Sequence, residues 1–323
     1  MRCAFVGFDS AWNGKQGGIC YALFEGDRLG DYCLPKPADF VHASSVIERF
    51  RADADYTLVA VDQPTMVPNA TGMRPVERVA GSIKRGVQPA NLHGAMFDRS
   101  APIWSFLDGL DANEEPLKAQ KAAADLHVIE VFPGLALPAL LPPPGPELPH
   151  GLRYDPGKKS RFELAHWKQV TNSACMHAQK LDIEPFVGWS AKRADDTKPT
   201  KQDQDCLDAL ICLIVALKWH RGDPDTKVLG DWRGYMVTPL SAEAEKKATI
   251  KAKKHNVPIN RGSWDVYEAA LTYFDGRRYD TFEWLGHPNA ALEGETPLER
   301  AKTLAGTQLV LDLIGRLEHG IPT

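Results

Sequence analysis

Apolar residues form three short runs along the chain, and each run carries an acid at or near its end. These are residues 4–8 before Asp9, residues 56–61 before Asp62, and residues 126–132, which contain Glu130. Nearly continuous apolar runs of this length predict strands covered on both faces of a sheet. A carboxylate beside a buried strand is costly unless it is solvated, paired or bound to a cation. One such acid is typical of a loop cap, but a repeated pattern indicates a functional site.

Further elements predict an α/β fold. Residues 17–24 and 28–34 read as two more strands joined by a turn, and apolar spacing over 40–50 predicts a helix. Seven prolines between residues 133 and 149 predict an irregular loop rather than a helix.

A fourth acidic stretch opens the segment 203–217. Asp205 and Asp208 lie one helical turn apart, and the residues after Leu210 are apolar on every side. This pattern predicts a helix buried against a sheet. Acids at a helix start also complement the helix dipole. Asp208, however, falls where the helix becomes wholly apolar, and a carboxylate there needs a partner.

The composition sets the class of protein. With 323 residues the chain is long enough for a large core and a second small domain. A formal net charge of -4 excludes a surface coated in basic residues, although not a local basic groove. The six cysteines are scattered without a C-x-x-C pair, so we expect buried thiols and a cytoplasmic setting. We expect no targeting or membrane-spanning segment.

The acids together suggest metal chemistry. Clustered carboxylates repel one another unless a cation neutralises them, and hard oxygen ligands select Mg²⁺ or Mn²⁺. A pair of such ions supports phosphodiester cleavage. No His/Cys spacing for zinc is visible.

Basic residues follow the acidic motifs. Arg74 and Glu77 are three residues apart, which fits either a surface ion pair or a contact to substrate beside Asp62. Lys158, Lys159 and Arg161 form a cluster that is solvated by default but could hold phosphates near an acidic site. We predict that Arg74 and this cluster line the mouth of the acidic site.

Several motifs in this order resemble an uncharacterised family of predicted RNase H-like nucleases, over roughly residues 1 to 240. The motifs are Gly7-Phe8-Asp9-Ser10-Ala11-Trp12, Val61-Asp62-Gln63-Pro64, Gly72-Met73-Arg74-Pro75-Val76-Glu77-Arg78, Glu130-Val131-Phe132-Pro133 and Asp205-x-x-Asp208-Ala209. The resemblance implies an RNase H-like mixed sheet flanked by helices. It also implies a catalytic metal site formed by Asp9, Asp62, Glu130 and Asp208, with Asp205 as an alternate.

The sequence changes character after residue 240. Residues 241–259 are rich in Lys, Glu and Ala, and predict a solvated helical linker. Residues 260–323 predict a small all-α domain or a helical tail packed on the main body. Its last helix has one apolar face formed by Leu309, Val310, Leu313, Ile314 and Leu317. A bundle this small has little core of its own and gains stability by packing against another surface.

This C-terminal part resembles the toxin-binding domain of Xre/MbcA/ParS-type antitoxins. The resemblance rests on the run Phe282-Glu283-Trp284-Leu285-Gly286-His287-Pro288-Asn289, on Thr296-Pro297-Leu298-Glu299 and on Arg316-Leu317-x-His319-Gly320. It implies a cognate toxin or a second copy of the chain as partner. The expected partner-binding residues are Trp284, Leu313, Leu317, His319 and Ile321, the last in a terminus free to reach a partner.

Three functional hypotheses follow. The first is a divalent-metal-dependent nuclease acting on DNA or RNA and carrying a partner-binding domain. The second is a non-catalytic antitoxin or scaffold. The third is an ATP-dependent phosphotransferase of the actin/sugar-kinase branch, in which Asp9 and Asp62 would hold Mg-nucleotide and residues 14–18 would contact phosphate. Binding of ATP separates the third hypothesis from the first.

Overall fold

The computed structural model describes residues 1–10, 15–142 and 151–321. Several predicted features lie outside these ranges, namely Ala11-Trp12, Gly14, the prolines between residues 143 and 149, and Pro322-Thr323.

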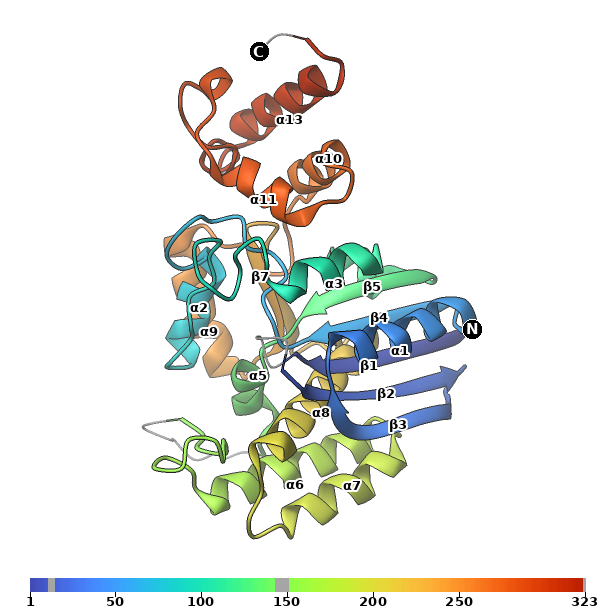
Figure 1. Ribbon diagram of the computed structural model, residues 1–323. Helices are drawn as coiled ribbons and strands as arrows, with labels where there is room; N and C mark the ends of the chain where they lie inside the picture. The colour runs from blue at the N-terminus through green and yellow to red at the C-terminus, as the bar shows by residue number, and fades with distance from the viewer. Residues whose placement is uncertain (11–14, 143–150, 322–323) are drawn as a thin grey trace.

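A five-stranded mixed sheet forms the centre of the main body, in the order β3-β2-β1-β4-β5 (Figure 1). Its strands are β1 (Arg2–Asp9), β2 (Gly17–Glu25), β3 (Arg28–Ala38), β4 (Tyr56–Val61) and β5 (Asp125–Glu130). The first three strands are antiparallel neighbours, while β4 pairs parallel to β1 and β5 parallel to β4. The predicted α/β class and a mixed sheet flanked by helices are confirmed.

Helices surround this sheet and form the C-terminal region. They are α1 (Phe40–Asp53), α2 (Pro75–Ile83), α3 (Pro102–Leu110), α4 (Pro116–Lys121), α5 (Pro133–Leu140), α6 (Leu164–Lys180), α7 (Glu184–Ala194), α8 (Lys201–His220), α9 (Ala242–His255), α10 (Asp265–Tyr273), α11 (Arg278–Gly286), the short 3-10 turn η1 (Ala290–Leu292), α12 (Pro297–Arg300) and α13 (Leu304–Glu318).

The two faces of β1 explain its unbroken apolar run. On one face the Phe8 ring packs on Phe40 of α1 and Phe106 of α3, with centroid distances of 5.5 and 5.7 Å. On the other face the strand carries Gly7, and a Cβ there would collide with the backbone of α8. Gly18 of β2 meets the same helix at Asp205. Helix α8 therefore lies unusually close to the sheet, which brings its first turns to the ends of the strands.

Residues 133–140 contradict the prediction of an irregular loop, because they form α5. Pro133 occupies the first helical turn, where the N–H that proline lacks has no partner within the helix. Leu135, Leu137 and Leu140 are buried, so packing against the body stabilises the helix. The number of prolines alone does not reveal that Pro133 is compatible with the first turn of a helix.

The segment after α8 adds a two-stranded antiparallel unit, β6 (Thr226–Asp231) and β7 (Gly234–Pro239), followed by α9. The predicted helix is present, but it is not a solvated linker. Ala244, Ala248 and Ala252 are buried in a small second core that also contains Val79 and Met236. An alanine face lets α9 lie flat against its neighbours, so the helix belongs to the body.

The C-terminal helices α10 to α13 pack on the main body, at the top of Figure 1. Arg278 of α11 is buried and pairs with Glu114 at 2.9 Å and with Asp108 at 3.0 Å. The Phe282 ring packs edge-on against Trp104 of α3, with centroids 5.6 Å apart. Apolar residues of both parts thus form one continuous core.

Candidate metal centre and its basic rim

Three carboxylates meet where the sheet ends. Asp9 is the last residue of β1, Asp62 follows β4, and Asp208 lies on the third turn of α8. One oxygen from each lies within 4.8 Å of the others. The register explains the meeting of the first two, because Phe8 pairs with Val61 and the Asp62 amide donates to the Phe8 carbonyl at 2.9 Å. This part of the predicted set comes together as expected.

The electrostatics of the cluster indicate that it disfavours its own ionised form. Burial first, and then Asp9 and Asp208, raise the pKa of Asp62 well above its usual range. Burial raises the pKa of Asp208 to about 7, although hydrogen bonds from Tyr154 and Gln204 oppose that shift. Tyr154 Oη donates to Asp208 Oδ1 at 2.8 Å and holds the carboxylate in place. A cation at this point would relieve the repulsion, and three carboxylate donors suit Mg²⁺ or Mn²⁺.

Glu130 lies outside this group, contrary to the prediction that it shares the metal. In the β4–β5 ladder Glu130 pairs with Val61, one residue before Asp62. Successive side chains of a strand point to opposite faces, so this register directs the two acids apart. The Glu130 carboxylate instead accepts hydrogen bonds from both terminal nitrogens of Arg74, at 2.8 and 2.7 Å.

Arg74 and Glu77 are internal residues rather than surface contacts. Arg74 is completely buried, and its Nε donates to Glu77 Oε1 at 2.8 Å. Its Nη1 also donates to the carbonyl of Met66, in the loop that follows Asp62. These groups satisfy one another and form a buried network that fixes this loop. Arg74 and Glu77 also border the cavity beside Asp62, so their predicted contact to a substrate stays a prediction.

Asp205 also lies apart from the three carboxylates. Its side chain pairs with Lys201, one turn earlier on α8. The predicted alternate ligand is therefore engaged by a lysine.

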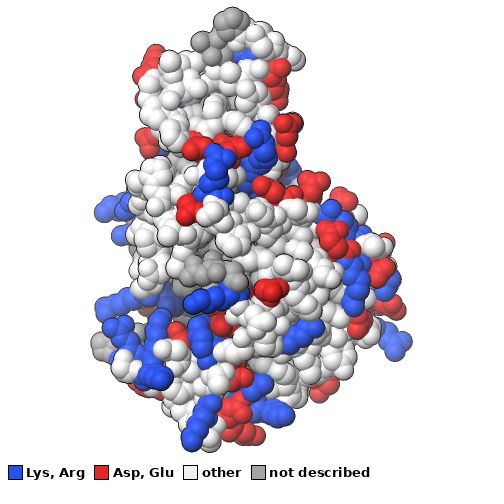
Figure 2. Space-filling model, in the orientation of Figure 1, with Lys and Arg blue, Asp and Glu red and all other residues white. Residues whose placement is uncertain are grey.

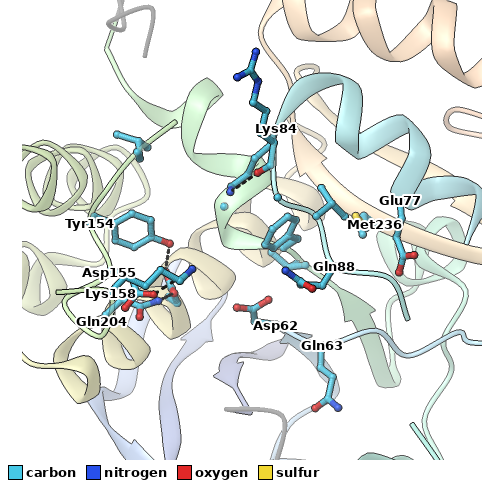
Figure 3. Close-up of a pocket in the computed structure, with 18 of the residues that line it drawn as sticks. Asp62, Gln63, Glu77, Lys84, Gln88, Tyr154, Asp155, Lys158, Gln204 and Met236 are labelled. Atoms are coloured by element: carbon cyan, nitrogen blue, oxygen red, sulfur yellow. Dashed lines mark hydrogen bonds and ion pairs between the residues drawn. The ribbon is translucent and has the colours of Figure 1, made fainter. Parts of the chain in front are cut away.

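A cavity of about 740 Å³ opens over Asp62 and Asp208 (Figure 3). Its lining includes six cationic side chains, which are Arg74, Lys84, Arg85, Arg153, Lys158 and Arg161. Arg74, Lys158 and Arg161 were predicted at this mouth and line the cavity; Lys159 is exposed and does not line it. Lys84 and Tyr154 were missed as site residues. The basic loop at residues 84–85 was the available signal.

Lys84 is a partly buried cation of the cavity wall. Its ammonium lies 5.5 Å from the centre of the Phe132 ring and donates to the Arg85 carbonyl at 3.3 Å. Burial, and then Lys158, lower the pKa of Lys84, while Asp208 and Asp62 act in the opposite direction. Within the described residues no carboxylate forms an ion pair with it. It is thus placed to meet an anion above the acids.

Family comparisons agree with a two-part chain. The family model described as "Protein of unknown function (DUF429)" matches residues 7–229, which contain Asp9, Asp62 and Asp208. The chain belongs to the DUF429 family. The model of the antitoxin Xre/MbcA/ParS C-terminal toxin-binding domain matches residues 269–320, which supports a toxin as a partner of this DUF429 protein. No curated protein and no solved structure matches the chain.

The antitoxin-like region buries part of its predicted partner surface. Leu313 is in the core together with Val310 and Ile314, so the prediction that Leu313 contacts a partner is wrong for this packing. Trp284 and Leu317 are partly exposed, while His319 and Ile321 are exposed. Leu304 and Leu309, which the sequence analysis did not single out as partner residues, are 93% and 44% exposed on α13.

None of the described helices is both long enough and apolar enough to cross a lipid bilayer.

The described residues also bear on the phosphotransferase hypothesis. Gly18 lies inside β2 and its lack of a side chain is required by contact with α8 rather than by a ligand.

Proposed function

We propose that this protein is a divalent-metal-dependent nuclease whose C-terminal domain binds a protein partner. The observation that carries the proposal is the close group of Asp9, Asp62 and Asp208, of which Asp62 and Asp208 line a cavity that also has a cationic wall. Carboxylates alone repel a phosphodiester, and cations alone do not activate water. Their combination suits metal-assisted phosphodiester hydrolysis.

Each group has a distinct role in this proposal. Asp9, Asp62 and Asp208 would hold Mg²⁺ or Mn²⁺, which supplies Lewis-acid chemistry at the phosphorus centre when bound. Tyr154 orients the Asp208 carboxylate through its hydrogen bond. Lys84, Lys158 and Arg161 bind the non-bridging phosphate oxygens that the carboxylates repel.

The fold supports an RNase H-like assignment. An antiparallel β1-β2-β3 unit extended by the parallel strands β4 and β5 is the sheet that the resemblance implies. Acids at the ends of β1 and β4 and on the buried helix α8 support this assignment. The function itself rests on the site and not on the fold, because one fold supports many reactions.

A cleavage assay tests the proposal. Purified protein is incubated with labelled single-stranded and duplex DNA and RNA, with Mg²⁺, Mn²⁺ or EDTA. We expect metal-dependent cleavage that Asp62→Asn abolishes, whereas Asp205→Asn, an acid outside the group on the same face of the site, retains it. A wild-type protein inert on all substrates with both metals would favour the non-catalytic antitoxin hypothesis, and saturable ATP binding would favour the phosphotransferase.

The match to a toxin-binding domain supports the second half of the proposal. We propose that α13 contributes the exposed Leu304 and Leu309 to the toxin interface, beside His319 and Ile321. Co-expression with a cognate toxin followed by size-exclusion chromatography tests this. Leu304→Lys with Leu309→Lys should prevent co-elution, while Val41→Lys, at a 79% exposed position on α1, should not. Elution of the chain alone as a dimer would favour a second copy as partner.

A further inference from the structure

Helix α9 carries a basic cluster on a protein whose net charge is -4. Lys251, Lys253, Lys254 and His255 lie on its last turns. The two acids at its start are neutralised, because Glu243 pairs with Lys247 and Glu245 with Lys227. Positive charge is therefore concentrated at the C-terminal end of the helix.

These lysines have no acidic partner among the described residues. Neither Lys251, Lys253 and Lys254 nor the exposed Arg78 of α2 takes part in an ion pair there. Burial, and then Lys251, Arg78 and Lys254, lower the pKa of His255, so cations from two helices gather around one point. Like charges held together cost free energy unless an anion binds them.

The helix holds its cations in fixed positions. Its alanine face is buried against α2 and the β6–β7 unit. The lysines therefore project from a packed element and not from a flexible tail. A fixed array of cations loses less entropy on binding an extended anion than a mobile one.

Helix α2 connects this cluster to the cavity. Arg78 and Gly81 are exposed and lie three residues apart on one stripe of α2, and Arg85 is exposed two residues beyond the end of the helix at Ile83. Arg85 lines the cavity wall. Five helical residues at 1.5 Å each, from Arg78 to Ile83, and two extended residues at about 3.3 Å each give at most about 14 Å between the two arginines. This span corresponds to about four phosphates of one polynucleotide chain at 3.4 Å each. In Figure 2, Lys and Arg gather most densely at the lower left of the view, and others lie along its right edge.

We infer that a polynucleotide lies along a basic track that runs from α9 over Arg78 and Arg85 to the mouth of the cavity. The inference rests on the proposed nuclease function and extends it, because it makes the substrate a chain of several nucleotides and not a mononucleotide. A polyanion fits the track better than an acidic protein does, since the cations form a line leading to the phosphate-binding wall.

Salt-dependent binding tests the track. The anisotropy of a labelled 20-nucleotide single strand is measured against NaCl concentration, in an Asp62→Asn background that prevents cleavage. The test variant replaces Arg78, Lys251, Lys253 and Lys254 by Gln. The matched control replaces four exposed cations on β3, α1 and α4 by Gln, which are Arg28, Lys36, Arg51 and Lys121.

For four lost phosphate contacts we expect the slope of log K against log salt to fall by about 3, since each contributes about 0.7 for single strands. Affinity at low salt should fall at least about 10-fold, and the control should match the parent. An unchanged slope and affinity in the test variant overturns the track. The track is also overturned if the control variant loses as much affinity as the test variant, or if only an acidic peptide displaces the oligonucleotide.

Hydrolysis of bis(p-nitrophenyl) phosphate by the wild type distinguishes failure of the proposed basic track from failure of the proposed nuclease function. If the wild type hydrolyses this small ester with Mn²⁺ while the test variant binds the oligonucleotide normally, the track is overturned and the nuclease proposal stands. If the oligonucleotide binds through the four cations but neither substrate is cleaved, the track stands and the nuclease proposal fails.

Discussion

Asp62→Asn should stabilise the metal-free protein, although it removes a residue of the proposed active site. The substitution keeps the shape of the side chain and deletes one of three charges held within 4.8 Å. Burial and the neighbouring acids raise the pKa values of Asp62 and Asp208 in the folded protein. Folding without metal therefore works against ionisation of this cluster, and neutralising one member relieves it.

The magnitude follows from the separation and the pKa shift. Two unit charges 4.8 Å apart repel by about 3.5 kcal/mol at an effective dielectric constant of ~20. The pKa of Asp208 rises from 3.8 to about 7, which corresponds to about 4 kcal/mol of destabilised ionised form. Burial contributes most of that shift and remains in the variant. We expect a gain of about 1–3 kcal/mol in the free energy of unfolding at pH 8.

The pH dependence has a definite sign. Between pH 4 and about 7 the unfolded chain binds fewer protons at Asp208 than the folded chain does. Stability of the metal-free wild type must therefore fall as pH rises through this window. At pH 4 the raised pKa values keep Asp62 and Asp208 protonated in the folded state, and the gain from Asp62→Asn should vanish.

Urea unfolding in EDTA at pH 4.5, 6 and 8 measures these effects. Asp9→Asn should behave like Asp62→Asn, while Asp205→Asn should give no gain because Asp205 already pairs with Lys201. Saturating Mn²⁺ should reverse the order, stabilising the wild type above the variant at pH 8. A loss of stability for Asp62→Asn in EDTA at pH 8, or an equal change at every pH, would refute the reasoning.

Three further predictions concern the neighbours of this site. Glu130→Gln removes one of the two buried carboxylates that pair with Arg74 and should cost about 1.5–3 kcal/mol of unfolding free energy in urea, because Glu77 still pairs with the arginine; a neutral result would show that the pair is not needed. Arg278→Met should separate the unfolding of the C-terminal helices from that of the main body in calorimetry, and the neighbouring Arg277→Met, at an exposed position, should keep a single transition. Lys158→Gln should raise KM for oligonucleotide cleavage several-fold and Lys159→Gln should not, because only the first lines the cavity; equal effects would remove the distinction.

Local pattern was sufficient for the elements that carry the carboxylates. The runs before Asp9 and Asp62 are apolar because both faces of those strands are covered, and this is visible without neighbours. The apolar pattern of α8 predicted a buried helix in the same way, with an acid at the point where the helix surface becomes wholly apolar. The α/β class and three of the four expected carboxylates could therefore be predicted from the chain alone.

The sequence alone could not predict whether the Glu130 side chain joins the other acids. Its strand is as apolar as the other two, but whether its acid joins theirs depends on register, and a shift of one residue turns a side chain to the opposite face. Strand register between segments 70 residues apart arises only when the sheet is assembled. The same assembly buried Arg74 at the cavity border against Glu130 and Glu77, and it brought Lys84 to the cavity wall.

Burial of the later helices was also a tertiary outcome. The composition of α9 predicts a solvated helix, because four of its last six residues are Lys or His and only alanines face the other way. Alanine carries little hydrophobic signal in a sequence, yet it permits the close contact that seats α9 on α2. The sequence by itself determined which residues form helices and strands and which acids interrupt apolar runs. Only the tertiary structure decided which of those charges meet one another and which face a ligand, because pairing depends on distances that the linear order does not contain.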